Sequence, residues 1–245
     1  MLRPNLQHFC CFAILLSISL VKLAAQNTGE ITQSKSKLAI EVYENQFKNE
    51  FLFINGREYK PYHLPKHENP YLESVAGFGT IYMQGYVFED KKLNYDIYKD
   101  LLIVNPEYYD FANVYIELNK TLVDSFNIQL ESRSYQFINY KKENCLNTLN
   151  TGFYECLYKT SKTELLIKHM VLLGVDNALD TYQYKQQRFL RIDNRYYNIT
   201  KKKQLLALFP DKKKVVRKKI KSIYFSYNKM SGKQLTQLIQ FTATL

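Results

Sequence analysis

Two short runs of strand-forming residues flank a turn in Gly79-Thr-Ile-Tyr-Met-Gln-Gly-Tyr-Val-Phe-Glu89. Aromatic and β-branched residues fit a pleated, half-buried surface, and Gln84-Gly85 between the two runs is typical of a tight turn. The next stretch repeats this arrangement, because Leu93–Tyr98 and Leu101–Val104 lie on either side of Lys99-Asp100. These residues predict two antiparallel hairpins in succession.

Similar signals continue outward in both directions. Turn residues between strand-like runs predict three further hairpins, centred on Asn55-Gly56, Thr160-Ser161 and Asp193-Asn194. Apolar residues alternate with polar ones at 114–118, 126–130 and 135–140, which is the period of half-buried strands. Ten or more short strands joined by tight turns predict a mainly β (α+β) fold. We expect an antiparallel meander over residues 36–199 that forms a curved open sheet, a half-barrel or a sandwich.

Helical patterns lie at both ends of this β region. From residue 36 the apolar side chains recur at helical spacing, which predicts a short N-terminal helix. After residue 199 we expect three amphipathic helices capped by Thr200, Asp211 and Ser231, with Pro210 ending the first. Their apolar positions need a partner surface, so residues 200–245 are expected to pack on the sheet. These positions are Leu205, Leu206 and Phe209, then Val216, Ile220, Ile223, Tyr224 and Tyr227, then Leu235, Leu238 and Ile239.

The first 25 residues have the layout of a cleavable secretory signal peptide. Arg3 precedes an apolar run from Phe9 to Val21, and the small residues Ala24 and Ala25 follow it. An apolar helix of this length spans roughly 20 Å, which is short of the ~30 Å core of a bilayer. We therefore expect export, cleavage after Ala25, a disordered lead-in over 26–35 and no transmembrane span in the mature chain. The alternative is an uncleaved anchor, which Lys22 near the cleavage site favours.

The net charge of +11 is concentrated in one stretch of the chain. Residues 201–221 hold ten basic residues against a single acid, Asp211, so the rest of the exported chain is about neutral. Outside the cytoplasm we expect no nucleic-acid partner, and the expected partners are anionic lipid, lipopolysaccharide or an envelope protein. The alternative is a solvated helix face. The ten basic residues are Lys201, Lys202, Lys203, Lys212, Lys213, Lys214, Arg217, Lys218, Lys219 and Lys221.

Aromatic residues are abundant, with 21 Tyr and 15 Phe but no Trp. Strand-rich structure accounts for this excess, because flat rings pack on half-buried sheet faces. A sugar-stacking surface is the alternative interpretation, and the absence of Trp weakens it.

Two cysteines, Cys145 and Cys156, remain after the expected cleavage. An even number of cysteines in an exported protein favours a disulfide, which would stabilise so short a loop by roughly 2.5 kcal/mol. The alternative is two free, buried thiols.

Residue types that perform catalysis form no recognisable motif. His63 and His67 are four residues apart beside Glu68, but the prolines at 61, 65 and 70 oppose the helix that a metal site of this spacing needs. His169 is expected to be a sheet-face histidine rather than a catalytic base. Asp96 is expected to face outward and pair with a neighbouring lysine. Nucleophile-elbow and phosphate-binding glycine motifs are absent, so we expect no enzyme activity, no metal and no cofactor.

Several short motifs occur in a recognisable order. They are Asn55-Gly-Arg-Glu-Tyr59, Tyr95-Asp-Ile-Tyr-Lys-Asp100, Gly152-Phe-Tyr-Glu155 with Leu157-Tyr158, Arg195-Tyr-Tyr197 and Leu208-Phe-Pro-Asp-Lys-Lys-Lys214. Their order and spacing resemble a family of uncharacterised exported proteins of Bacteroidota with no assigned activity, and the resemblance covers residues 36–228. The family usually has an apolar residue at the position of Cys156. The resemblance implies a Gram-negative envelope location, either the periplasm or the outer-membrane surface.

These observations together predict a non-enzymatic binding or scaffold protein of the cell envelope, with a basic helical face directed at anionic components. One alternative is a half-barrel carrier whose concave aromatic face holds a lipid or another apolar ligand. A large apolar cavity would favour the carrier, and a filled core would oppose it. A further alternative is a hydrolase of unrecognised type, which needs His63, His67 or His169 in a pocket with a carboxylate or hydroxyl. The sequence leaves the ligand and the oligomeric state open.

Overall fold

The computed structural model describes residues 56–62, 69–105, 115–131, 133–142, 149–176, 179–224 and 226–245. The chain divides into two units, Met1–Leu52 and Phe53–Leu245, and every described residue belongs to the second unit. The predicted signal peptide (1–25), lead-in (26–35) and N-terminal helix lie outside the described residues. So do His63, His67 and Cys145, and the expectations placed on them stay predictions.

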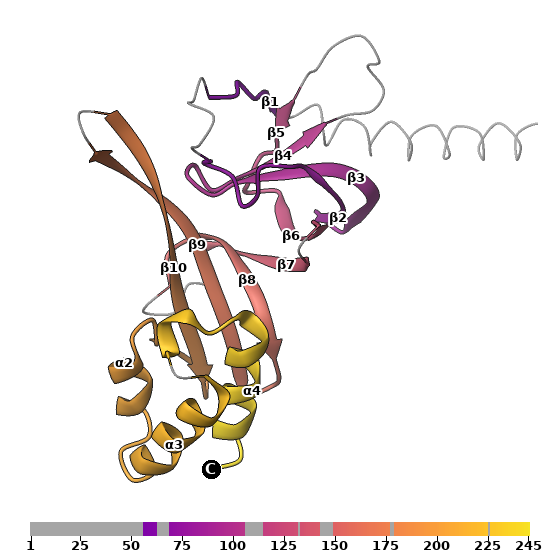
Figure 1. Ribbon diagram of the computed structural model, residues 1–245. Coiled ribbons are helices and arrows are strands. Elements are labelled where there is room, and N and C mark those ends of the chain that lie inside the picture. Colours follow the sequence, from indigo (N-terminus) through magenta and orange to yellow (C-terminus); the bar gives the residue numbers. More distant parts are fainter. Residues whose placement is uncertain are drawn as a thin grey trace, which may run out of the picture. The chain divides into compact units, whose positions relative to one another are not determined.

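In the described part of the chain, eleven antiparallel strands form one sheet (Figure 1), in the order β1-β5-β4-β3-β2-β6-β7-β8-β9-β10-β11. The sheet is open, with β1 and β11 at its two edges, so the predicted mainly β fold with a curved open sheet is confirmed. The strands are β1 (Arg57–Glu58), β2 (Gly77–Met83), β3 (Tyr86–Asp96), β4 (Leu101–Asn105), β5 (Ile116–Glu117), β6 (Val123–Gln129), β7 (Ser134–Tyr140), β8 (Gly152–Lys159), β9 (Thr163–Asp176), β10 (Leu179–Ile192) and β11 (Arg195–Asn198).

The predicted turns connect neighbouring strands as expected. Gln84 and Gly85 have φ angles of 50° and 80° between β2 and β3, and Asp193 and Asn194 have 44° and 66° between β10 and β11. Residues with φ > 0 match the right-handed twist of a two-residue hairpin, which is why these positions could be identified locally. The hairpin predicted at Asn55-Gly56 cannot be compared in full, because residues 51–55 lie outside the described part; Arg57–Glu58 pair with β5.

The strand register assigns side chains to two faces of the sheet. Phe126 pairs with Phe137, Phe137 with Glu155, and Glu155 with Ile167, so these side chains share one face. Ile167 belongs to the apolar cluster that includes the C-terminal helices, so we name this the helix-side face. The opposite side is the outer face.

Aromatic rings fill the helix-side face of the central strands. Tyr95, Phe126, Phe137 and Phe153 are all buried, with centroids 4.7–5.8 Å apart and mostly edge-to-face geometry. Such arrangements stabilise a core beyond simple area burial. The abundance of aromatic residues therefore contributes mainly to packing of the sheet.

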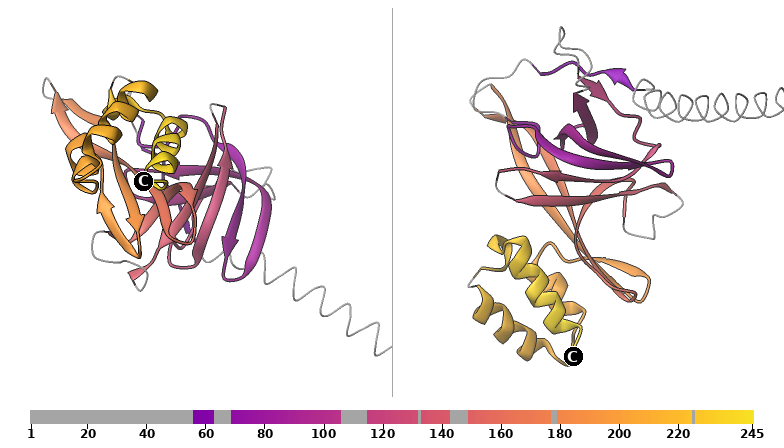
Figure 2. Two further views of the ribbon diagram at one scale, coloured as in Figure 1. Left: turned by 90° about the horizontal axis from the view of Figure 1, so that it is seen from below. Right: turned by 90° about the vertical axis from the view of Figure 1, so that its right-hand side faces the viewer.

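Three α-helices follow the sheet: α2 (Lys202–Ala207), α3 (Lys213–Ile223) and α4 (Gly232–Thr242), with a 3-10 turn, η2 (Tyr227–Lys229), before α4. They lie beside the ends of β8–β10 (Figures 1 and 2) and bury Leu205, Val216, Ile220 and Leu238 against Leu165, Ile167 and Leu190 of β9 and β10. This confirms the predicted helical region. No helix in the described part of the chain is long and apolar enough to cross a bilayer.

One buried cation joins the helical region to the sheet. The guanidinium of Arg188 on β10 donates to the carbonyl oxygens of Tyr227, Asn228 and Met230, at 2.8, 3.1 and 3.2 Å. A buried guanidinium without acceptors would be costly, and here three backbone acceptors around η2 satisfy it. The turn before α4 is thereby fixed to the sheet.

Two of the three predicted helix caps are wrong. Helix α2 begins after Lys201, while the Thr200 hydroxyl accepts the backbone N–H of Arg188 instead. Helix α3 begins after Lys212, and no side chain caps it, so Asp211 has no capping role. Ser231 does cap α4, by accepting the backbone N–H of Gln234. A strand residue in need of an acceptor competed for Thr200, which local sequence cannot reveal.

Candidate functional site

The ten basic residues predicted to bind an anionic surface lie on and next to α2 and α3. In α3 the buried side chains Val216 and Ile220 fix which side of the helix faces the apolar cluster that the helices share with β9 and β10. Most of the ten are exposed, and only Lys202 and Lys219 are half-buried. The structure therefore places this predicted set on a solvent-facing surface, which we name the basic face.

Four members of the basic face form a stripe along α3. Lys214, Arg217, Lys218 and Lys221 lie at i, i+3, i+4 and i+7, a spacing that places them on one side of a helix. All four are exposed. At 1.5 Å rise per residue the stripe extends over roughly 10 Å, so four cations can meet one flat surface at the same time.

The basic face lacks internal counterions. None of its ten residues forms an ion pair with any residue that the structure describes. Asp211, the single acid of this stretch, is exposed and forms none either. Lys219 makes a cation–π contact instead, with its Nζ 5.1 Å from the ring centroid of Phe241. The charge of the face is thus directed into solvent.

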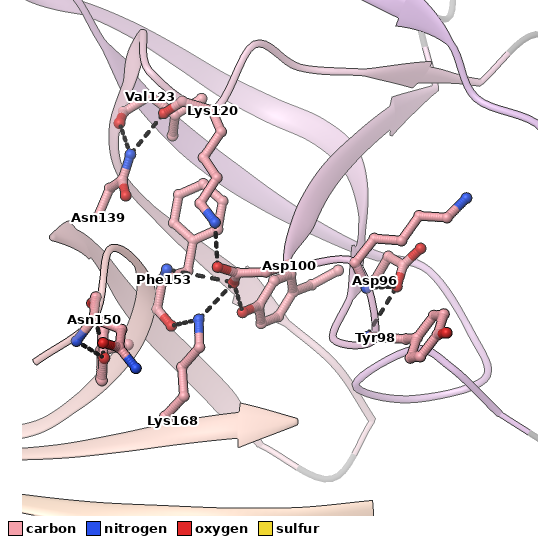
Figure 3. A network of polar contacts seen from close by, with 12 residues as sticks. Asp96, Tyr98, Asp100, Lys120, Val123, Asn139, Asn150, Phe153 and Lys168 are labelled. Atoms are coloured by element: carbon pink, nitrogen blue, oxygen red, sulfur yellow. Dashed lines mark hydrogen bonds and ion pairs between the residues drawn. The ribbon is translucent and has the colours of Figure 1, made fainter. Parts of the chain in front are cut away.

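Several cations of the sheet, unlike those of the basic face, have acidic partners. The cluster around Asp100 is the best example (Figure 3). Lys120 and Lys168 approach Asp100 from two sides, with Lys168 Nζ 2.7 Å from Oδ1. The hydroxyl of Tyr95 donates to the same carboxylate at 2.5 Å. Burial lowers the pKa of Lys168 below its ordinary value, although Asp100 acts in the opposite direction.

Gly152 makes this cluster possible. It has a φ angle of 134°, which disfavours any residue with a side chain. A Cβ atom at this position would lie 2.1 Å from Oδ2 of Asp100 and 2.7 Å from Nζ of Lys168. The cluster therefore occupies space that only a glycine leaves free.

Asp96 is buried, which contradicts the expectation of an outward-facing residue paired with lysine. It is 0% exposed and accepts hydrogen bonds from the hydroxyls of Tyr59 and Tyr62, at 3.0 and 2.8 Å. Its other oxygen accepts the backbone N–H groups of Tyr98 and Lys99. Lys99 lies over the Tyr62 ring, 4.5 Å from its centroid. Asp96 ends β3 and fixes the following turn, where the alternation of strand faces no longer applies.

His169 lies in the sheet, as expected, within a chain of hydrogen bonds. Its Nε2 is 2.7 Å from Oε2 of Glu155 and its Nδ1 is 2.5 Å from the Tyr184 hydroxyl. Glu155 also pairs with Arg133, at 2.7 Å. His169 is 1% exposed and both of its ring nitrogens are engaged, so it has no free nitrogen to offer a substrate. This geometry favours a structural role over that of a catalytic base.

Another buried acid, Glu164, accepts hydrogen bonds from the hydroxyls of Tyr140 and Tyr196, at 2.8 and 2.5 Å, and pairs with Lys159 and Arg191. Burial opposes its charge, but the hydrogen bonds from the tyrosines and Lys159 outweigh burial and hold the pKa of Glu164 below its ordinary value. Among the described residues, three buried acids, Asp96, Glu155 and Glu164, and the half-buried Asp100 thus each have their own set of donors.

Cys156 lies half-buried on β8, and its predicted disulfide partner, Cys145, lies outside the described residues. Burial raises the pKa of the Cys156 thiol to about 11, so without a disulfide this residue would be a thiol rather than a nucleophilic thiolate at neutral pH. The disulfide stays a prediction.

Sequence reasoning found the basic face but missed the buried acids Glu155 and Glu164 and the half-buried Asp100. Glu155 had a usable signal, because it interrupts the apolar run Phe153–Tyr158, and a charge inside such a run needs a buried partner. Asp100 gave no such signal, because it sits among ordinary turn residues.

Comparison of the chain with protein-family models, with curated proteins and with solved structures finds no match. The resemblance to exported Bacteroidota proteins therefore stays a prediction, and the functional argument rests on the residues of this chain.

Proposed function

We propose that this protein is a non-enzymatic component of the cell envelope that binds a phosphate-bearing lipid surface through its basic face. The supporting observation is the contrast in charge pairing. Cations of the sheet such as Lys168 and Arg133 have buried acidic partners, whereas the basic face has ten cations without ion pairs among the described residues.

The stripe on α3 supplies the affinity in this proposal. A basic residue near an anionic lipid surface contributes roughly 1 kcal/mol at low salt. The stripe residues Lys214, Arg217, Lys218 and Lys221 would together strengthen binding by roughly a thousandfold. Because the attraction is electrostatic, it weakens as the Debye length shortens with added salt.

Sedimentation with vesicles tests the proposal. We expect the protein to bind vesicles containing phosphatidylglycerol at low salt, to dissociate at high salt, and to ignore pure phosphatidylcholine. A second arm with lipopolysaccharide in the vesicles distinguishes that source of phosphate from phospholipid. Equal binding to neutral and anionic vesicles, or no binding to any, would overturn the proposal and leave an envelope protein as the partner to seek.

Two variants with the same change in net charge test whether vesicle binding depends on the position of the positive charges or only on their number. The stripe variant K214E/R217E/K218E/K221E should lose binding to anionic vesicles. The control variant K60E/K92E/K162E/K185E changes the net charge by the same amount at exposed lysines of the sheet region and should keep most of the binding. Equal loss in both variants would mean that net charge, rather than the basic face, drives adsorption.

Export is part of the proposal and depends on residues 1–25. We expect the protein isolated from the periplasm or the outer membrane to begin at Gln26, with the signal peptide removed. N-terminal sequencing of that material checks this, and an intact N-terminus would favour the anchor instead.

The two alternatives receive less support. The carrier needs a hollow helix-side face, and that face is filled by Tyr95, Phe126, Phe137 and Phe153. Of the three histidines that the hydrolase could use, His169 is buried with both nitrogens engaged, and His63 and His67 lie outside the described residues. Neither alternative has an observation in its favour comparable to the unpaired basic face.

A further inference from the structure

The outer face of the central strands has an unusual composition. β2, β6 and β7 alternate buried and exposed positions, so every second residue faces outward. Nine of the outward residues are uncharged: Phe78, Thr80 and Tyr82 on β2, Ser125, Asn127 and Gln129 on β6, and Ser134, Gln136 and Ile138 on β7. Charges lie only around them, because Asp124, where the β2–β6 register shifts, pairs with Lys141 at 2.6 Å, and Lys92 of β3 lies opposite Phe78.

Two aromatic rings on this face are exposed. Phe78 is 56% exposed and Tyr82 is 41% exposed, whereas most of the described rings are buried or half-buried. They are four residues apart on one strand, or about 13 Å at 3.3 Å per residue. A single sugar ring does not span that distance, so the pair suits an extended chain of sugars.

Carboxamides lie directly beside these rings. Phe78 pairs with Gln129 and Thr80 with Asn127 in the β2–β6 ladder. The Asn127 Oδ1 accepts the backbone N–H of Thr80, which orients the amide and leaves its two N–H donors free of that bond. The Gln129 Nε2 donates to the carbonyl of Leu130, which leaves its Oε1 as an acceptor. The face therefore offers fixed donors and acceptors next to apolar rings.

A cavity continues this surface at the point where β7 separates from β8. The two strands pair only from Phe137 to Tyr140, and beyond Phe137 a cavity of about 480 Å³ opens. Its lining includes Asn127, Gln129 and Gln136 of the outer face. Arg133 and Glu155 also line it, but they neutralise each other at 2.7 Å.

We propose that the outer face of β2, β6 and β7 binds an uncharged polysaccharide. Phe78 and Tyr82 stack on the apolar C–H faces of successive sugars, because an aromatic ring presents a negative face to such groups. Asn127, Gln129 and Gln136 exchange hydrogen bonds with sugar hydroxyls. The nine uncharged residues suit a ligand without charges, and the cavity accommodates a chain end or a branch.

Affinity electrophoresis tests this inference with the intact protein, in native gels run toward the cathode because the isoelectric point is about 9.3. The gels contain dextran, laminarin, galactomannan or xylan as neutral probes, and heparin as an anionic one. We expect retardation by at least one neutral polysaccharide, unaffected by salt. Failure of the wild-type protein to bind any of the four would overturn the proposal.

Variants connect the binding to the named residues. F78A/Y82A should weaken binding to the neutral probe by roughly tenfold or more, and N127A/Q136A by a smaller factor. Tyr86→Ala is the matched control, because Tyr86 is exposed but pairs with the inward-facing Met83, and it should bind like the wild type. Equal binding by F78A/Y82A and the wild type would overturn the assignment.

The same variants keep this inference separate from the proposed function. The stripe variant of α3 should lose heparin and keep the neutral polysaccharide, whereas F78A/Y82A should do the opposite. Size-exclusion chromatography tests whether the outer face instead binds a second copy of the chain. A wild-type dimer that F78A/Y82A converts to a monomer would assign the face to a second copy of the chain and overturn the proposal.

Discussion

The sheet and the basic face accommodate positive charge in opposite ways. In the sheet, Lys168 and Arg133 pair with acids that are themselves largely buried. On α2 and α3, ten cations face solvent against one exposed acid that pairs with none of the described residues. Buried pairs are sensitive to the loss of either partner, whereas exposed charges contribute little to stability. The difference indicates that charge in the sheet maintains the fold and that charge on the helices is available for binding.

Removing one acid from each region is the strongest test of whether charge pairing stabilises the sheet but not the basic face. Asp100→Asn should lower the free energy of unfolding by about 3 kcal/mol, because Lys120 and Lys168 would lose their counterion. Asp211→Asn, in the basic face, should change it by less than about 0.5 kcal/mol. Urea unfolding measures both, and similar values would show that the two regions do not differ.

Alanine substitutions at two glycines with φ > 0 distinguish the cost of a steric clash with the Asp100 cluster from the cost of backbone strain. Gly152→Ala should cost about 2–3 kcal/mol, because its Cβ would collide with Asp100 and because φ is 134°. Gly85→Ala has nothing within 4 Å of the new Cβ and should show only the strain of its φ of 80°, about 1 kcal/mol. Thermal unfolding of the two variants gives the difference, and a larger effect at Gly85 would contradict the role assigned to Gly152.

The Glu164 cluster predicts how the sheet responds to pH. The folded-state pKa of Glu164 lies below its unfolded value of about 4.5, so its stabilisation is present above that pH and is lost as the pH falls further. Burial raises the pKa of Tyr140 and Tyr196 above 10, so their stabilisation is present below pH 10 and is lost as the pH rises beyond it.

Unfolding curves across pH check this prediction with two variants. Glu164→Gln should flatten the acid side of the profile, and Tyr196→Phe should flatten the alkaline side. A variant that parallels the wild type at all pH values would contradict the assignment of that side.

The smallest expected effect on the free energy of unfolding is a stabilisation, whereas the preceding substitutions destabilise the protein. Lys218 is four residues from Lys214 and three from Lys221, and like charges at these spacings destabilise a helix by about 0.2–0.5 kcal/mol per pair. Lys218→Gln should therefore stabilise the protein by a few tenths of a kcal/mol while weakening vesicle binding. Precise chemical denaturation at low salt measures the gain, which added salt should reduce. A loss of stability would mean that Lys218 has a partner in the fold.

Much of the fold could be predicted from the sequence because its signals are local. Gln84-Gly85 and Asp193-Asn194 mark turns through their own backbone preferences, and the apolar spacing of α3 identifies its buried side. The pairing of charges is not local. Asp100 meets Lys168 across 68 positions of sequence only after the sheet has brought β9 to the end of β3. The prediction that Asp96 faces outward was wrong for a related reason. At the end of a strand, where a turn begins, side chains no longer alternate between the two faces of the sheet.

The hydrogen bonds of Arg188 have a consequence for the order in which the chain can fold during synthesis. Arg188 enters the sheet on β10, but its acceptors belong to Tyr227, Asn228 and Met230, some forty residues later. During synthesis, β10 can bury this guanidinium at low cost only once the chain has emerged to Met230. A chain cut before residue 227 would keep every strand that the structure describes yet leave a charge in its interior without an acceptor, which is the kind of defect that quality-control proteases remove.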